Sequence, residues 1–389
     1  MIKVEFVADV SSTAGYAAHA RLMLRAFDEV GLEKYDIDLA VTPRQKDDSV
    51  AVVTPVAQKA MSKYCQPKFA IPDVRVFFEP AQWAHFDGIP TVLFSQWETT
   101  GIRSHAKGGD HRQNWVQQLN QARVVMTSCH DAKVAFEDSG VTTPINVVGG
   151  PIFPHTAVGE LAILDVTCDE GGVAIPKASR PPVIGYMAQW SSRKHIEAFV
   201  RDVVLGFDRG QAIGVLKTYY GRDFSKSREV NEMVSKIVAS CRKPKPADIV
   251  VITNQLTDLQ VEQFFNTVDI YYAPSRGEGF SIPVSMAAAA GKWPIVPAFG
   301  GPRDYLSEDR VVPGSFSPAL AMTVYDPGQF WMDIDERAAI EKLQADAEQV
   351  RSGRQYTWTQ ECQALVKPEA FVHGFAQSVQ QASATASRS

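Results

Sequence analysis

The sequence predicts an α/β protein in which each half of the chain builds its own open parallel sheet. Short apolar runs typical of buried strands alternate with stretches of helical periodicity along most of the 389 residues. This is the order of repeated βαβ units. The alternation fails once, over residues 156–182, where glycine and proline accumulate between two regular regions. We therefore expect one domain over residues 1–155, a linker over 156–182 and a second domain over 183–367.

The composition is that of a globular protein and argues against several functional classes. The net charge of −5 speaks against a protein-wide affinity for nucleic acid or anionic membranes. No apolar run approaches the roughly 20 residues of a membrane-spanning helix. Five cysteines are scattered without a C-x-x-C pair, which favours reduced thiols over a disulfide scaffold or a zinc site. The chain begins with a strand pattern rather than a secretory leader, so we expect a cytoplasmic protein.

The first half of the chain contains predicted strands at residues 2–7, 37–41, 74–78, 91–94, 123–127 and 145–148. A helix follows the first strand from residue 17 to near Gly31. The loop between them is made of small residues and ends in Gly15 and Tyr16. It lacks the G-x-G-x-x-G spacing of a dinucleotide site, but a glycine directly before a helix lets a ligand approach the backbone closely. The alternative is an ordinary connection between a strand and a helix.

A second candidate site follows the fourth strand, where residues 95–101 contain Trp97, Glu98 and Thr99. In open α/β sheets, ligands bind at the carboxyl ends of the strands. An indole ring and a carboxylate at this place suit stacking against, and hydrogen bonding to, a polyhydroxylated acceptor.

The next segment, residues 103–115, is locally basic. Against a single acid, Asp110, it carries five basic side chains: Arg103, His105, Lys107, His111 and Arg112. Together with the adjacent Trp115, this loop could meet an anionic acceptor such as a phosphate, a lipid head group or nucleic acid. The alternative is a solvated run of charges without a binding role.

The second half repeats the alternation, with strands predicted at residues 183–187, 215–220, 249–253, 269–274 and 293–299. Helices are predicted at residues 196–207, 259–268, 284–290, 334–352, 358–365 and 369–381. Arg193 and Lys194 stand just before the first of these helices. Two cations at a helix start oppose the helix dipole, which favours an anion bound beside them. The alternative is a solvated pair. Lys217, close to the end of a strand, is a candidate for lining a nucleotide pocket.

The most informative stretch is residues 273–306, where a strand, a turn rich in glycine and serine, a helix and another strand follow in quick succession. Pro283 in the first helical turn and Gly291 at the end mark the helix boundaries. The exposed N–H groups at the helix start attract an anion. Glu278 lies in the same turn, and its carboxylate suits the hydroxyls of a sugar rather than a phosphate. The alternative is an ordinary glycine turn with a solvated glutamate.

This stretch resembles the donor-site signature of retaining glycosyltransferases with two Rossmann-like domains (the GT-B fold), especially glycosyltransferase family four, the glycosyl transferases group 1. The family pattern is Pro-Ser-x-x-Glu-Gly-Phe-Gly-Leu-Pro-x-x-Glu-Ala-x-Ala-x-Gly. The residues that match it are Pro274, Ser275, Glu278, Gly279, Phe280, Pro283, Ala287, Ala289 and Gly291. Ser281 and Ile282 are mild changes.

One departure from the pattern concerns the nucleotide. Met286 stands in the place of the second Glu, which in the family usually holds the ribose hydroxyls of the donor. Because a thioether accepts hydrogen bonds poorly, the ribose must be held in another way, or the donor is unusual.

The resemblance implies two Rossmann-like domains facing a cleft, with a closing helix, at about residues 368–389, that crosses back onto the first domain. It implies transfer of a sugar from a nucleotide-sugar donor to an acceptor hydroxyl with retention of the anomeric configuration, with no metal and no cofactor beyond the nucleotide sugar itself. The family grips the donor diphosphate with an Arg and a Lys. Lys194 is the best match for the Lys, and Arg193 is a substitute for the Arg, because Tyr186 follows Gly185 where the family carries Arg.

The resemblance also assigns roles to the remaining candidates. Glu278, Arg193 and Lys194 would form the catalytic group. The donor would be bound by Gly15, Tyr16, Lys217, Gly279, Phe280, Ser281, Ile282 and Met286. The acceptor, whose identity the sequence leaves open, would be bound by Trp97, Glu98, Thr99 and Arg103; some branches of the family have a related Trp-Glu-Ser/Thr stretch.

Three other functions remain open at this point. The first is a DNA- or other nucleic-acid-modifying glycosyltransferase of the same fold, whose acceptor would meet the basic loop at residues 103–115. The second is a non-catalytic nucleotide-sugar-binding protein of the GT-B type, for which Met286 is the main support. The third is an epimerase or phosphorylase with two Rossmann-like domains; a phosphorylase would require a lysine that holds pyridoxal phosphate.

Overall fold

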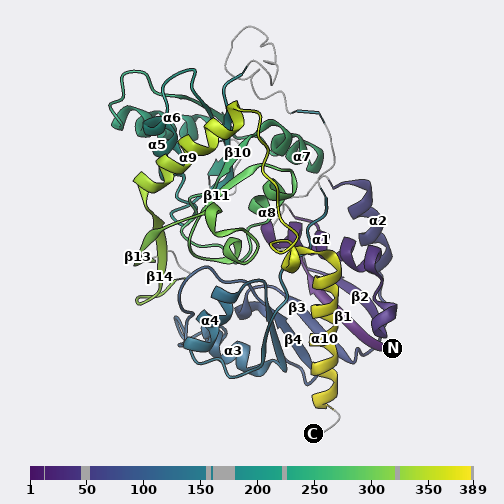
Figure 1. Ribbon diagram of the computed structural model, residues 1–389. Helices are drawn as coiled ribbons and strands as arrows, with labels where there is room; N and C mark the ends of the chain where they lie inside the picture. The colour runs from purple at the N-terminus through teal and green to yellow at the C-terminus, as the bar shows by residue number, and fades with distance from the viewer. Residues whose placement is uncertain are drawn as a thin grey trace.

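The computed structural model describes the chain except for Thr13 and residues 45–52, 155–158, 161–179, 221–225, 320–324 and 387–389. The described part forms two six-stranded sheets and a separate two-stranded sheet, with helices packed around them (Figure 1). This confirms the predicted α/β fold with one sheet in each half. Most of the predicted linker, residues 156–182, lies outside the described residues.

The first sheet has the strand order β2-β1-β3-β4-β5-β6. Its strands, all paired in parallel, are β1 (Ile2–Ala8), β2 (Ile37–Pro43), β3 (Val74–Phe78), β4 (Thr91–Phe94), β5 (Val124–Thr127) and β6 (Ile145–Val147). The helices beside it are α1 (Gly15–Val30), α2 (Pro55–Tyr64), α3 (Trp115–Gln121) and α4 (His130–Asp138). We call this sheet and its helices the N-terminal lobe. Its strands read as nearly continuous apolar runs because both faces of the sheet are covered.

The second sheet has the order β12-β11-β10-β7-β8-β9. Its strands, also all parallel, are β7 (Val183–Trp190), β8 (Ile213–Tyr220), β9 (Asp248–Ile252), β10 (Ile270–Tyr272), β11 (Trp293–Pro297) and β12 (Val311–Val312). The helices are α5 (Ile196–Gly206), α6 (Ser227–Ser240), α7 (Asp258–Thr267), α8 (Ile282–Ala289) and α9 (Glu336–Arg351). An antiparallel hairpin, β13 (Gly314–Pro318) and β14 (Phe330–Ile334), stands between β12 and α9. We call this part the C-terminal lobe.

The order of the strands determines where ligands can bind. In each sheet, one pair of neighbouring strands sends its connections in opposite directions: β1 and β3 in the N-terminal lobe, and β7 and β10 in the C-terminal lobe. The loops that leave the carboxyl ends of such a pair diverge and leave room for a ligand. Residues 191–195 follow β7, and residues 273–281 follow β10. These are the segments with the cations and with Glu278.

The last helix, α10 (Pro368–Ala386), belongs in space to the N-terminal lobe, as predicted (Figure 1). Two fully buried rings on it, Phe371 and Phe375, pack against Phe27 of α1 at centroid distances of 5.7 and 4.7 Å. Phe375 also meets Phe6 of β1 edge-on at 6.2 Å. Burying each of these rings contributes about 1.5–3 kcal/mol of stability. The chain thus crosses from the C-terminal lobe to the N-terminal lobe, and this burial holds α10 on the N-terminal lobe after the crossing.

Two predicted helices differ from the structure. Residues 358–365 form turns and a short 3₁₀ helix, Ala364–Val366, instead of an α-helix. This segment leads the chain from one lobe to the other, and the Trp358 indole donates a hydrogen bond to the carbonyl of Tyr305 at 2.7 Å. The predicted helix at 334–352 begins two residues later, because Ile334 ends β14 and Asp335 caps α9 by accepting from the N–H of Ala338. The sequence patterns did not predict α2, α3, α6, β12 or the β13–β14 hairpin.

A buried carboxyl group lies beneath the strand that carries the Glu278 turn. Asp202 of α5 is fully buried and accepts a hydrogen bond from the hydroxyl of Tyr272 in β10 at 2.5 Å. Burial raises the pKa of Asp202 to about 7, although the Tyr272 hydroxyl and the nearby Arg201 oppose the increase. A group with a higher pKa in the folded chain binds its proton more strongly when folded, so folding is favoured at acid pH.

We therefore expect the stability of this protein to depend on the protonation of Asp202. The free energy of unfolding should fall as the pH rises from about 4, the pKa of an unfolded aspartate, to about 7. Asp202→Asn keeps an acceptor for Tyr272 without the charge, so it should flatten this dependence and raise the melting temperature at pH 8 relative to wild type. Thermal unfolding between pH 5 and 8 measures the effect, with exposed Asp138→Asn as the control. Curves of the same shape for wild type and Asp202→Asn would contradict this assignment.

Candidate functional site

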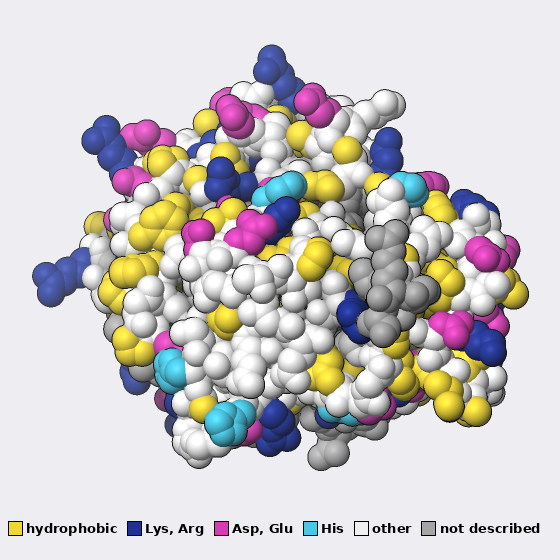
Figure 2. Space-filling model, turned by 90° about the horizontal axis from the view of Figure 1, so that it is seen from below, with side chains coloured by type: hydrophobic (Ala, Val, Ile, Leu, Met, Phe, Trp, Pro, Cys, Tyr) yellow, Lys and Arg dark blue, Asp and Glu magenta, His cyan; other side chains and the backbone are white. Residues whose placement is uncertain are grey.

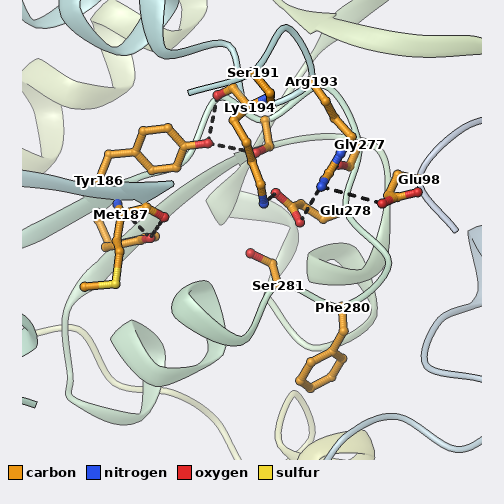
Figure 3. A network of polar contacts seen from close by, with 12 residues as sticks. Glu98, Tyr186, Met187, Ser191, Arg193, Lys194, Gly277, Glu278, Phe280 and Ser281 are labelled. Atoms are coloured by element: carbon orange, nitrogen blue, oxygen red, sulfur yellow. Dashed lines mark hydrogen bonds and ion pairs between the residues drawn. The ribbon is translucent and has the colours of Figure 1, made fainter. Parts of the chain in front are cut away.

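The two loops at the carboxyl ends of β7 and β10 are joined by a buried tyrosine. The hydroxyl of Tyr186 donates to the carbonyl of Lys194 at 2.8 Å and lies 2.8 Å from the hydroxyl of Ser275, which is left to donate to it (Figure 3). A backbone bond from the N–H of Arg276 to the carbonyl of Arg193, at 2.8 Å, makes a second link. Tyr186 stands where the family carries Arg, and here it fixes the position of both loops.

The side chains of these loops form a charged cluster. The ammonium group of Lys194 contacts Glu278 Oε1, and Arg193 Nη1 lies 3.3 Å from Glu278 Oε2 and donates to the carbonyl of Gly277 at 2.8 Å (Figure 3). On its other side, Arg193 Nη2 lies 3.5 Å from Oε1 of Glu98, which comes from the N-terminal lobe. The structure thus brings together all three residues predicted as the catalytic group and adds Glu98 to them.

Partial burial determines the charge states of this cluster. Burial alone would raise the pKa of Glu278, but Lys194 and Arg193 outweigh it and lower the pKa to about 2. Burial and the neighbouring Arg193 lower the pKa of Lys194, against the opposing effect of Glu278. Burial raises the pKa of Glu98, partly countered by Arg193. At neutral pH Glu278 is therefore an ionised carboxylate, which can only accept hydrogen bonds.

The helix that follows the Glu278 turn begins without a side-chain cap. Ser281, the residue before α8, has a left-handed backbone (φ 63°), and its hydroxyl makes no capping bond. Pro283 lies in the first turn, as predicted. The hydroxyl of Tyr305 donates to the carbonyls of Phe280 and Ser281 at 2.7 and 3.0 Å, which holds the turn. An uncapped helix start is a favourable place for an anion such as a phosphate.

Glycines in the turn allow the two lobes to touch. A Cβ at Gly277 would lie 1.8 Å from the carbonyl oxygen of Glu98, and one at Gly279 would lie 2.9 Å from Gln96 Oε1. Gly277 is therefore required by close contact with the backbone of the loop after β4, and Gly279 packs tightly against the Gln96 side chain. A second contact lies nearby, where the N–H of His130 donates to Asp304 at 2.7 Å and the N–H of Gly300 donates to Asp131 at 2.6 Å. The lobes are closed onto each other at the cluster.

The residues predicted to bind the acceptor divide into two groups. Trp97, Thr99 and Arg103 are at most 4% exposed. The Trp97 indole donates to the Thr99 hydroxyl and to the carbonyl of Gly101, and its ring packs on Trp115 at 4.4 Å. A ring enclosed in this way cannot stack on an acceptor, so the structure does not support that role for Trp97. Of the predicted acceptor residues, Glu98 is the one that lies in the cluster.

The predicted donor residues outside the cluster have different environments. Gly15 is exposed at the start of α1, with open space where a Cβ would be. Tyr16 accepts a hydrogen bond from the N–H of Gln96 at 3.1 Å and so supports the loop after β4. Lys217 is 6% exposed in β8, where burial lowers its pKa to about 8. Met286 lies on α8, partly buried against the core of the C-terminal lobe.

The basic segment at residues 103–115 is less cationic than its sequence indicates. Arg103 is buried against Asp326 at 2.7 Å, and Arg112 pairs with Asp110 at 3.0 Å. On the face shown in Figure 2, basic and acidic side chains are interspersed among uncharged ones and form no extended basic patch. Two hollows of about 560 and 460 Å³ lie away from the cluster, one between α4, β6 and α10 and the other beside the crossing segment.

Within the described residues, no three His, Cys, Asp or Glu side chains are arranged to hold a metal ion. Nor does any described helix have the length and apolar character needed to span a bilayer.

No family model and no curated protein matches the sequence. Among solved structures, sucrose-phosphate synthase from Thermosynechococcus elongatus is 15% identical over 99% of this chain and 100% of its own, with a TM-score of 0.60. Anabaena HepE in complex with UDP and glucose is 14% identical over the whole of both chains, with a TM-score of 0.56. The lipopolysaccharide outer core galactosyltransferase WaaB is 14% identical over 97% of this chain and 99% of its own, with a TM-score of 0.52.

The chain has the GT-B fold. In this fold, two residues near the cluster were missed by the sequence analysis. Tyr186 was noted only as a mismatch, although a tyrosine directly after a glycine in a buried strand was a signal. Arg276, inside the glycine turn, binds Asp333 of the β13–β14 hairpin at 2.5 Å. Its charge in an otherwise small-residue turn was the corresponding signal.

Proposed function

We propose that this protein is a glycosyltransferase that moves a sugar from a nucleotide-sugar donor to an acceptor hydroxyl, with retention at the anomeric carbon and without a metal. The observation that carries the proposal is the cluster of Arg193, Lys194 and Glu278 beside the uncapped start of α8. Cations, a helix start and a hydroxyl-binding carboxylate are the groups that a sugar diphosphate requires. The complex of HepE with UDP and glucose supports a uridine diphosphate donor.

The cations of the cluster would act on the leaving diphosphate, and its carboxylate would act on the sugar. Arg193 and Lys194, together with the start of α8, would neutralise the diphosphate as its bond to the anomeric carbon breaks. Glu278 would accept hydrogen bonds from donor hydroxyls. A carboxylate with a pKa of about 2 is a weak base, so Glu278 is unsuited to removing the proton of the acceptor.

The closed contact between the lobes has a consequence for binding. The Glu278 turn touches the loop after β4 directly, and Arg193 bridges Glu278 and Glu98. We propose that the lobes separate to admit the donor and close again over it, which excludes water from the reacting sugar. Phosphate would then replace part of the carboxylate contacts of Arg193.

Met286 supports a smaller contribution of the ribose, relative to the diphosphate, to the affinity for the nucleotide. Its thioether offers the ribose an apolar contact rather than a charged acceptor. We therefore propose that the diphosphate contributes more of the affinity here than in relatives with Glu at this position. The same residue favours the second candidate function, a nucleotide-sugar-binding protein without transferase activity.

A panel of UDP, GDP, ADP and dTDP sugars, with the free diphosphates and uridine, tests the proposal. At least one sugar nucleotide should raise the melting temperature and be consumed when an acceptor or water is present. A ligand at 100 times its Kd adds about 2.7 kcal/mol of stability, which is readily detected, and uridine alone should have little effect. Binding with neither transfer nor hydrolysis would favour the non-catalytic function. No shift and no turnover with any member would contradict both.

A further inference from the structure

The β13–β14 hairpin has no place in the chemistry described so far. In the sequence it lies between β12 and α9. In space it reaches from the C-terminal lobe to the N-terminal lobe (Figure 1). Side chains on both faces of β14 are buried, with Trp331 1% and Met332 7% exposed. The strand and the segment before it contact two loops of the site, the Glu278 turn and the loop after β4.

The base of the hairpin holds the Glu278 turn through Arg276. Asp333 of β14 binds the Arg276 guanidinium at 2.5 Å, and the N–H of Met332 donates to the carbonyl of Arg276 at 2.8 Å. The same guanidinium lies 5.2 Å from the ring centre of Trp331 and donates to the carbonyl of Ser192 at 2.8 Å. Side chain and backbone of Arg276 are thus both fixed, one residue before Gly277.

Residues 325–330 of the hairpin hold the loop after β4. Asp326 binds the buried guanidinium of Arg103 at 2.7 Å. Thr100 and Phe330 exchange two hydrogen bonds of 3.0 Å, from the N–H of Thr100 to the carbonyl of Phe330 and from the N–H of Phe330 to the hydroxyl of Thr100. The ring of Tyr325 meets Trp97 edge-on at 5.8 Å. These partners flank Glu98 on both sides.

We propose that the β13–β14 hairpin is a positioning element that sets the loop after β4 against the Glu278 turn. Asp326 is its positioning residue on the Glu98 side, and Asp333 is its positioning residue on the Glu278 side. Between the two held loops lie the contact of Gly277 with the Glu98 backbone and the bridge from Arg193 to Glu98. The inference rests on the proposed function, because the acceptor would enter beside Glu98.

The buried ion pair between Arg103 and Asp326 makes the loop after β4 sensitive to mutation. Arg103 is 2% exposed, and its guanidinium also donates to Gln113 Oε1 at 2.9 Å. Removal of the Asp326 carboxylate breaks a buried ion pair, which is strongly destabilising, so residues 97–103 should shift. The shift would carry Glu98 away from Arg193, whereas Lys194 and the start of α8 would stay in place.

Asp326→Ala tests the proposal in the full chain, with Asp110→Ala, which removes the partner of Arg112 in an exposed loop, as the matched control. Transfer by Asp326→Ala should fall at least tenfold relative to hydrolysis of the same donor, and the Kd for UDP should stay within twofold. Asp326→Asn should restore part of the transfer. Asp333→Ala should instead weaken UDP binding. If Asp326→Ala folds poorly, Gln329→Ala replaces it, because Gln329 Oε1 accepts a hydrogen bond from the Thr99 hydroxyl at 3.3 Å.

Equal losses in transfer, hydrolysis and UDP binding for Asp326→Ala, or no loss at all, would overturn the positioning role. If wild type consumes no sugar nucleotide, the proposed function fails, and hydrogen exchange then decides the positioning role separately. Asp326→Ala should speed amide exchange both at residues 97–103 and, through Glu98 and Arg193, at residues 275–278. Faster exchange confined to residues 97–103 would mean that the hairpin stabilises one loop without positioning the two.

Discussion

Replacement of Lys194 by alanine is expected to lower kcat for sugar transfer by about 10²–10³-fold, the range found for the loss of one preorganised charge-stabilising group. Lys194 is one of two cations in contact with Glu278. Its removal takes away positive charge from the leaving diphosphate and leaves the Glu278 carboxylate less neutralised beside it. Both changes raise the energy of the transition state. Single-turnover kinetics with the donor found in the panel separates this effect from product release.

Two further variants complete this experiment. Lys194→Arg keeps the charge and should retain more activity than Lys194→Ala, while Glu278→Ala should lose activity because donor hydroxyls lose their acceptor. Lys236→Ala, on the exposed surface of α6, is the control and should behave as wild type. Normal transfer by both Lys194→Ala and Glu278→Ala would show that the reaction takes place elsewhere.

The fold could be predicted from the sequence because its strands are covered on both faces. Runs such as residues 74–78 and 91–94 are apolar except for Arg75 and Thr91, and the predicted and observed bounds of β3 and β4 agree. Not every helix with an apolar stripe was predicted. In α6, Val230 and Val234 are buried, and Met233, Ile237 and Val238 continue the same helical face, so its pattern was present but was not interpreted as a helix. The opposite error was made at Trp358, where an α-helix was predicted. Trp358 lies instead in the segment that crosses between the lobes.

The structure brings the predicted site residues together where each follows a strand closely in the sequence. The Glu278 turn, Arg193 and Lys194 each follow a strand directly, so their position followed from the fold. Arg103 and Trp97 were predicted to bind an acceptor, but the structure buries both side chains. Their surroundings are set by Asp326 and Tyr325, which lie more than 200 residues away in the sequence. A single sequence does not show such pairings. The same holds for the bridge from Arg193 to Glu98, which exists only because the lobes close.

Replacement of Arg310 by methionine is expected to cause the largest loss of stability, about 3–5 kcal/mol, because it breaks a buried ion pair and leaves one partner behind. Arg310 is 2% exposed and binds Asp346 of α9 at 2.8 Å. Its guanidinium also lies 5.0 Å from the ring centre of Trp293 in β11. The pair therefore ties α9 to the second sheet. Chemical denaturation of the full chain measures the loss.

The charge left on Asp346 makes this prediction specific. Methionine fills much of the volume of arginine, so the loss would come from the carboxylate, which among the described residues keeps its ion pair with Lys342 at 3.4 Å. Arg310→Met combined with Asp346→Leu should therefore recover most of the stability, since apolar residues replace buried ion pairs at little cost. Arg337→Met, which removes an exposed partner of Glu341, should leave the unfolding midpoint unchanged. A loss for Arg310→Met no greater than this control would mean that the pair adds nothing. A double variant as unstable as the single one would place the loss in packing against Trp293, because the uncompensated carboxylate is then absent.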